Sequence, residues 1–415
     1  MTEVEKSLNQ QRERYANLIF NIAFAVFVLK AFYSFTEIMP HYAERLIFNI
    51  CNLTVLGLSA YKMLFLQKYK IRQIFVCIFF AFATYYTDKQ IYSFLFLPAF
   101  FLLASTQDVD FRQTISFMYK IEAVIIGIHI ALYPIYYRFK PYAIGFTYRN
   151  GDHSQARHQF LLQHANIFSM LLLWTLIGYL YVNFDKLDKI KIIIVWLIYA
   201  FFHRFADSNS GMLILSTIAI LLFIKDVFPK QIEKLVDFLS RYLFIILSVI
   251  YTLMMVSFPK LNGGLRDIWK AVDSFFTGRL KYGAYVYDKV GFTILGQHLP
   301  FVSKEYWQGY WIDGIANDCT YMFFGVYYGL IYMFLIAFLF WKFAGKARFE
   351  EKIIIIAYTL YTMMELYVTY VYFCFALFIV MQYVWKETAQ EKVKIVRKNE
   401  RKIDKTKRIT DSPGI

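Results

Sequence analysis

The chain has 415 residues, of which 59% are hydrophobic and 20% aromatic, and it carries a formal net charge of +15. This composition lies outside that of a water-soluble globular domain and indicates an integral membrane protein. The charge does not indicate nucleic-acid binding, because ten Lys and Arg residues follow Trp385, in a segment typical of a solvated cytoplasmic tail beside anionic lipid. These ten are Lys386, Lys392, Lys394, Arg397, Lys398, Arg401, Lys402, Lys405, Lys407 and Arg408.

Apolar segments recur along the chain and predict its membrane spans, since a hydrocarbon core of roughly 30 Å takes about 20 helical residues. We predict crossings at residues 18–35, 46–66, 73–87, 90–104, 115–137, 165–184, 190–203, 211–224, 242–258, 320–341, 353–367 and 369–385. The last two divide one apolar stretch, because Glu365 would be costly at the bilayer centre. The expected fold class is an all-α polytopic membrane protein of about 12 transmembrane helices, with one transmembrane domain over residues 1–385 and a basic cytoplasmic tail over 386–415.

The distribution of positive charge predicts the orientation. With twelve crossings both termini lie on one side, and segments on that side hold 28 Lys and Arg residues against 14 on the other. Cytoplasmic loops are enriched in these residues, so both termini are predicted to be cytoplasmic. Segments 138–164 and 203–210, and the large loop 259–319 between the ninth and tenth spans, are then predicted to be external.

The first external cluster is RNGDHSQARHQFLLQHAN, residues 149–166, directly before an apolar span. If the chain there is already helical, Arg157 and His164 lie two turns apart on one face. A guanidinium suits a diphosphate because it is always charged and donates paired hydrogen bonds, and an imidazole can accept a proton near neutral pH. Arg149 and Asn166 are the accompanying binding candidates.

Metal binding is the alternative for the histidines of this cluster. His153, His158 and His164 recur at spacings of five and six residues, which do not bring all three to one helical face. Neither a cysteine nor an HExxH pattern joins them, so no metal site is predicted.

Three further polar clusters are predicted on the external face. Their candidate ligands for phosphate or sugar are Arg204 and Ser208 in residues 203–211, Arg279 and Gln297 in the large loop, and Asp318, Tyr321 and Glu365 beside the tenth and eleventh spans. Helix capping is the alternative for Ser208 and Asp318. The aromatic residues of the large loop suit either an interfacial belt or stacking on sugar rings.

At these places the sequence resembles the Wzy-like O-antigen and exopolysaccharide polymerases, a family related to the O-antigen ligases. The matching stretches are RHQFLLQHAN (157–166), DSNSG (207–211), TGRL (277–280) followed by LGQ (295–297), and DCTYMFFGVYYG (318–329), with Glu365 where the family often has a glutamate. The chain departs from the family at Leu161, Leu162 and Ala165, where a Gly-aromatic pair and a proline are usual, and Asn209 stands at the position of an arginine.

The resemblance implies a GT-C-like glycosyltransferase of the bacterial cytoplasmic membrane that works without cofactor or metal. Such a polymerase transfers a growing glycan from undecaprenyl diphosphate to an incoming lipid-linked repeat unit at the outer face, with inversion. Arg157 and Arg279 are then expected to hold the donor diphosphate, and His164 to activate or orient the acceptor hydroxyl. A chain-length regulator and a flippase are the expected protein partners. The other expected partners are undecaprenyl-diphosphate-linked oligosaccharides and membrane lipids, and no nucleic acid is expected to bind.

Two alternatives remain open. An O-antigen ligase uses the same donor with a different acceptor. A transporter of lipid-linked sugars belongs to another class, typically with internal repeats and discontinuous helices near the bilayer midplane. The sequence shows no repeat, and Lys30, Lys62 and Lys120 lie close enough to an interface to extend their ammonium groups to it, which leaves no midplane coupling site.

Overall fold

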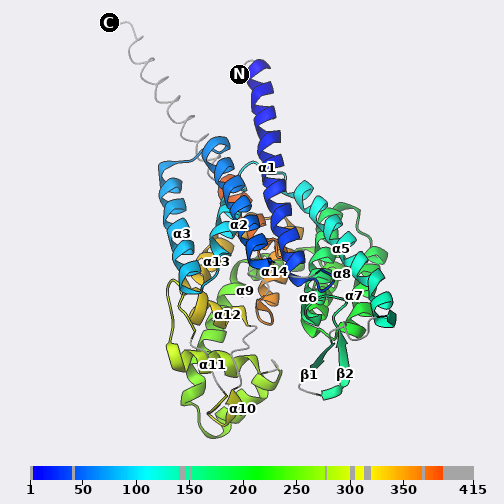
Figure 1. Cartoon of the computed structure of the whole chain (residues 1–415), viewed down its shortest axis with the longest axis vertical. Helices are drawn as coiled ribbons and strands as arrows, with labels where there is room; N and C mark the ends of the chain where they lie inside the picture. The colour runs from blue at the N-terminus through cyan, green and yellow to red at the C-terminus, as the bar shows by residue number, and fades with distance from the viewer. Residues whose placement is uncertain are drawn as a thin grey trace.

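The computed structural model describes residues 3–39, 43–139, 146–149, 152–275, 278–299, 304–312, 319–366 and 370–386 (Figure 1). The helices are α1 (Glu3–Phe35), α2 (Glu44–Tyr61), α3 (Ile71–Gln90), α4 (Phe96–Ala104), α5 (Phe111–Phe139), α6 (Ala165–Val182), α7 (Lys189–Ala206), α8 (Asn209–Val227), α9 (Pro229–Ser257), α10 (Gly263–Phe275), α11 (Arg279–Val290), α12 (Thr320–Phe323), α13 (Leu330–Phe343) and α14 (Phe349–Tyr361). A further apolar helix covers Ala376–Lys386. Two small antiparallel ribbons join them, β1 (Phe146–Arg149) with β2 (Asp152–His158), and β3 (Glu305–Trp307) with β4 (Tyr310–Ile312).

Six described helices are long and apolar enough to cross a membrane, which supports a membrane-embedded helical protein. They are Gln10–Phe35, Glu44–Leu66, Phe111–Phe139, Ala165–Val182, Asn209–Val227 and Pro229–Lys260. The other six predicted crossings contain helices outside this set, so the count of twelve stays a prediction. The predicted break in 353–385 is present, because α14 ends at Tyr361 and the next helix begins at Ala376.

Helix α6 lies at the centre of the bundle. Its side chains are buried on all sides, which explains why its sequence is apolar without a polar stripe. Trp174 packs edge-on against Tyr361 and Phe375 at ring distances of 5.9 Å. Helix α1 adds a second aromatic layer, in which Phe24 meets Phe378 at 5.1 Å.

The two ends of the bundle differ in character (Figure 1). Helix α1 begins at one end, and β1, β2, α10 and α11 lie at the opposite end, which we call the ribbon end. Trp385 lies at the end where α1 begins, because its indole donates a hydrogen bond to Thr106 while Asn17 of α1 donates to the Asp108 carbonyl in the same loop. Which compartment each end faces stays a prediction from charge.

Helix α4 is only 9 residues long, about 14 Å, and too short to cross a bilayer. Buried charges from its neighbours satisfy both of its ends. The Asp88 carboxylate accepts the N–H groups of Leu95, Phe96 and Leu97 at 2.9–3.1 Å, and the Lys62 ammonium donates to the carbonyls of Ser105 and Gln107. Each charge has the sign that the adjacent helix end favours.

The expectation that the lysines extend to an interface was wrong for two of them. Lys62 is fully buried and Lys30 nearly so, with its ammonium 2.7 Å from the Asn52 side-chain oxygen. Internal polar partners, rather than water, satisfy these two ammonium groups.

Replacing Lys62 by Met is expected to destabilise the bundle, because the buried carbonyl of Ser105, the C-cap of α4, and the partly buried carbonyl of Gln107 lose their charged donor. The penalty for such groups is about 1–3 kcal/mol each. The measurement is the midpoint of thermal unfolding in detergent, which should fall by on the order of several degrees. The matched control is Lys68→Met, at an exposed lysine six residues further along the chain. Equal midpoints for the two variants would contradict the capping role.

Candidate functional site

The corner between α7 and α8, residues 206–210, is where the predicted clusters meet. Arg157 of β2 reaches it from the N-terminal half: its Nε donates to the Ala206 carbonyl at 3.0 Å, and a terminal nitrogen donates to the Asn166 side-chain oxygen. Asn166 stands in the first turn of α6. One guanidinium therefore ties the β-ribbon to the start of α6 and to the end of α7.

The predicted helical relation between Arg157 and His164 was wrong. Residues 152–158 form a strand, in which Arg157 pairs with Thr147 of β1, and α6 begins only at Ala165. Phe160 and Leu161 between them have positive φ values of 51° and 60°, which turn the chain from the strand into the helix. The segment is pinned to the end of α1, since Gln163 N–H donates to the Phe35 carbonyl at 2.9 Å.

His164 is the N-cap residue of α6. Its Nδ1 accepts the backbone N–H of Asn166 at 3.0 Å, an interaction that satisfies one of the unpaired donors of the first turn. In the neutral ring with Nδ1 as acceptor, the proton sits on Nε2. The ring in this arrangement is suited to donate a hydrogen bond through Nε2.

Arg279 and Glu365 meet at the same corner from the C-terminal half. A guanidinium nitrogen of Arg279 lies 3.7 Å from Glu365 Oε1, and the Ser210 hydroxyl donates to that same oxygen at 2.9 Å. The Thr320 hydroxyl donates to the Glu365 backbone carbonyl at 2.6 Å. The carboxylate is 3% exposed and the Arg279 side chain 16%, so the pair is almost enclosed.

Asp273, which the sequence analysis missed, positions Arg279. Its carboxylate accepts the N–H of Lys281 at 3.1 Å, and its backbone carbonyl accepts that of Gly278 at 2.8 Å. Gly278 takes a φ of 82°, and Arg279 is the first residue of α11. Burial raises the pKa of the Asp273 carboxyl, opposed by the hydrogen bonds from Lys281 and Leu280 and by the Lys281 charge. No local spacing signal marks this residue, because it lies six residues before the helix that it caps.

Gln297 has a structural place at a break in the predicted tenth span. That span is discontinuous: α12 has only four residues, a π-turn follows over Phe324–Tyr328, and α13 begins after Gly329. The Gln297 side-chain nitrogen donates to the Val326 carbonyl at 2.7 Å, and the Gln297 backbone N–H donates to the Tyr327 carbonyl at 3.0 Å. The stretch 291–297 thus satisfies the carbonyls that the break releases.

The remaining candidates are dispersed. Tyr321 is buried, and its hydroxyl donates to the Thr359 carbonyl at 3.0 Å. Ser208 is the buried N-cap residue of α8, and Arg204 is exposed on α7. Arg149 ends β1 opposite Asp152, and Asp318 lies outside the described residues.

His158 is packed as an aromatic residue. Its Nδ1 shares a hydrogen bond with the Tyr133 hydroxyl, and its ring meets Phe205 edge-on at 5.7 Å. Burial lowers the pKa of His158, which favours the neutral ring. Within the described part of the chain, no group of three or more His, Cys, Asp or Glu side chains could hold a metal ion.

Comparison with known proteins returns no match to a family model, to a curated protein or to a solved structure. The resemblance to the Wzy-like polymerases therefore stays an expectation from the motifs, and the function is inferred from the residues gathered at the α7–α8 corner.

Gly329→Ala is expected to disrupt the break between α12 and α13. Gly329 has a φ of 120°, and a Cβ there would lie 2.4 Å from the Ile294 carbonyl oxygen, which is backbone and cannot turn away. We expect a lower thermal midpoint and less monodisperse protein after detergent extraction. Gly127→Ala is the control, because a Cβ at Gly127 meets open space. Equal behaviour of the two variants would show that the break tolerates a side chain.

Proposed function

We propose that the chain is a polysaccharide polymerase of the bacterial cytoplasmic membrane, acting on polyprenyl-diphosphate-linked repeat units at its outer face. The observation that carries the proposal is the shared anchorage of Arg157 and Arg279. These arginines come from segments far apart in the sequence, yet one binds Ala206 and the other pairs with the carboxylate bound by Ser210. Two guanidinium groups at one corner suit a ligand with two adjacent anionic phosphates.

The looseness of the Arg279–Glu365 pair supports a ligand-binding role for Arg279. A tight charge-assisted hydrogen bond is about 2.7–2.9 Å long, and the observed separation is 3.7 Å. A phosphate that draws Arg279 away from Glu365 therefore replaces an ion pair of 3.7 Å rather than a short bidentate one. Glu365 keeps its hydrogen bond from Ser210 in that movement.

In the proposed reaction the acceptor hydroxyl of the incoming unit attacks the anomeric carbon of the donor glycan. The new C–O bond forms as the bond from that carbon to the diphosphate breaks, and the diphosphate leaves with the electron pair. Arg157 and Arg279 stabilise the charge that develops on it. The hydroxyl proton passes to a base, and attack opposite the leaving group inverts the anomeric centre.

His164 is the proposed residue for the acceptor hydroxyl. The Nδ1 hydrogen bond to the Asn166 N–H supports the orienting role over the base role, because the acceptor nitrogen is engaged in capping α6. As a base, His164 would first have to release that cap.

A transporter of lipid-linked sugars is a second candidate, favoured by the discontinuous helix at Gly329 and by the half-length α4. Transporters use carbonyls released at such breaks to bind ions. Here Thr293 N–H donates to the Gly325 carbonyl, and Gln297 to those of Val326 and Tyr327, so the chain itself occupies these carbonyls. The polymerase is therefore better supported.

A deletion strain that carries Arg157→Ala or Arg279→Ala is expected to make no long polymer, since losing one charge-stabilising donor lowers the rate by about 10² to 10³. The measurement is the size, by mass, of extracted lipid-linked oligosaccharides. Single repeat units should accumulate on the polyprenyl diphosphate. Arg138→Ala, an exposed arginine at the predicted external end of α5, is the control and should restore long chains.

The double variant Arg279→Ala/Glu365→Gln separates a structural role of Arg279 from a catalytic one, because it also removes the buried carboxylate charge that pairs with Arg279. The double variant should recover the membrane level of the protein but not the polymer. Long chains in it would exclude Arg279 from the chemistry. If the deletion strain itself kept long chains on the carrier lipid, the protein would instead be a ligase. If that strain accumulated single repeat units only in the inner leaflet, the protein would be a transporter.

A further inference from the structure

An apolar groove lies between α3 and α13, floored by α4 and the helix Ala376–Lys386. Its volume is about 730 Å³, within the roughly 300–1,000 Å³ typical of small-molecule sites. Phe79, Phe80 and Val76 of α3 line one side, and Phe334, Leu335 and Phe338 of α13 line the other. The groove exists because α3 packs along α4 whereas α13 packs along α9, so the two helices do not close on each other.

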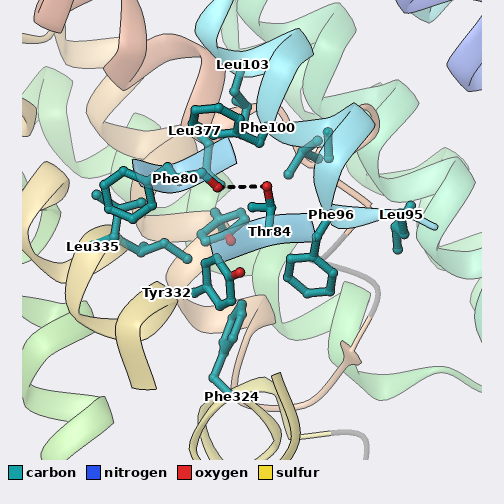
Figure 2. Close-up of a pocket in the computed structure, with 14 residues that line it drawn as sticks. Phe80, Thr84, Leu95, Phe96, Phe100, Leu103, Phe324, Tyr332, Leu335 and Leu377 are labelled. Atoms are coloured by element: carbon teal, nitrogen blue, oxygen red, sulfur yellow. Dashed lines mark hydrogen bonds between the residues drawn. The ribbon is translucent and has the colours of Figure 1, made fainter. Parts of the chain in front are cut away.

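A smaller hollow of about 100 Å³ continues the groove toward the ribbon end and shares Phe80, Phe100 and Leu103 with it (Figure 2). Figure 2 shows rings of Phe96, Tyr332 and Phe324 around this hollow. The one hydrogen bond drawn there, from the Thr84 hydroxyl to the Phe80 carbonyl at 2.7 Å, is internal to α3. The deep end of the groove is therefore suited to hydrocarbon.

The mouth of the groove is basic. Lys70 and Arg72 stand at the start of α3, and Lys342 stands in the last turn of the antiparallel α13, so all three lie at the end of the bundle where α1 begins. Among the described residues that line the groove none is acidic. The N-terminus of α3 adds the positive end of a helix dipole to the same place.

We propose that this groove binds one anionic phospholipid of the leaflet at the end where α1 begins, predicted to be the cytoplasmic leaflet. The phosphate lies among Lys70, Arg72 and Lys342, and an acyl chain follows the groove. The charge of the mouth complements the headgroup, and the apolar depth complements the chain. A lipid rather than a protein fits, because the neighbouring face of α3 exposes Phe75 and Phe82, which need a hydrocarbon surrounding.

The groove is separate from the proposed diphosphate site. The α7–α8 corner lies with β2 and α11 toward the ribbon end, and the basic mouth lies at the opposite end. A polyprenyl diphosphate bound by Arg157 and Arg279 would thus have its headgroup far from Arg72 and Lys342. The lipid site is therefore independent of the proposed function.

The test measures binding of phosphatidylglycerol to the purified full chain by native mass spectrometry, with phosphatidylcholine present as a competitor. In Arg72→Gln/Lys342→Gln the affinity for phosphatidylglycerol should fall roughly 10- to 30-fold, since each cation near an anionic lipid surface contributes about fivefold. Lys230→Gln/Lys234→Gln removes two exposed lysines at the start of α9, and it should bind as the unmodified chain does. Leu103→Trp, which fills the groove and keeps its cations, should also weaken binding.

Equal affinity of the groove variant and its control would overturn the proposal, as would equal binding of phosphatidylcholine and phosphatidylglycerol to the unmodified chain. The proposal would also be overturned if the chain bound polyprenyl phosphate more tightly than phosphatidylglycerol and lost that binding in Arg72→Gln/Lys342→Gln. That result would assign the groove to the carrier lipid. Undiminished binding to Leu103→Trp would place the lipid on the surface rather than in the groove.

Discussion

The Glu365 carboxylate is the constraint on which the ribbon-end geometry depends. A carboxylate that is 3% exposed needs hydrogen bonds and a counter-charge to remain ionised in such surroundings. Ser210 and Arg279 supply them, and Thr320 binds the backbone carbonyl of the same residue. The starts of α8, α11 and α12 are thereby fixed to the segment that follows α14. Movement of any one of these segments would stretch its contact with Glu365.

The same physical rule explains the half-length α4. A helix that begins and ends inside a bundle exposes unpaired N–H and C=O groups where water cannot reach them. Asp88 and Lys62 are the two charges that make such a helix possible. The Asp88 carboxylate binds the positive N-terminal end of α4, and the Lys62 ammonium binds its negative C-terminal end. Because α4 is short, α3 has no long partner, and the groove beside α13 follows from that. At α4 the two buried charges act as helix caps.

The sequence predicted the features that depend on composition alone. Apolar segments mark the helices, and the cost of burying Glu365 correctly predicted a break in the stretch 353–385, which the structure has between Tyr361 and Ala376. It did not predict that residues 152–158 form a strand, because a short polar segment lacks the periodicity that separates strand from helix. Nor did it reveal Asp88 or Asp273, whose partners lie across a turn or on a later helix and become visible only in three dimensions. The sequence singled out Arg279 as a candidate but not Asp273, which positions it.

The capping role of His164 bears on whether base catalysis or stabilisation of the leaving group contributes more to the proposed reaction. A base lowers the barrier most when the attacking hydroxyl must lose its proton early, and least when the leaving group departs first. A diphosphate held by two guanidinium groups is a good leaving group, so positive charge builds at the anomeric carbon before the new bond is complete. The acceptor hydroxyl then loses its proton late, and orientation matters more than basicity. A neutral His164 that donates through Nε2 while capping α6 suits that order of events, with Arg157 and Arg279 as the principal source of catalysis.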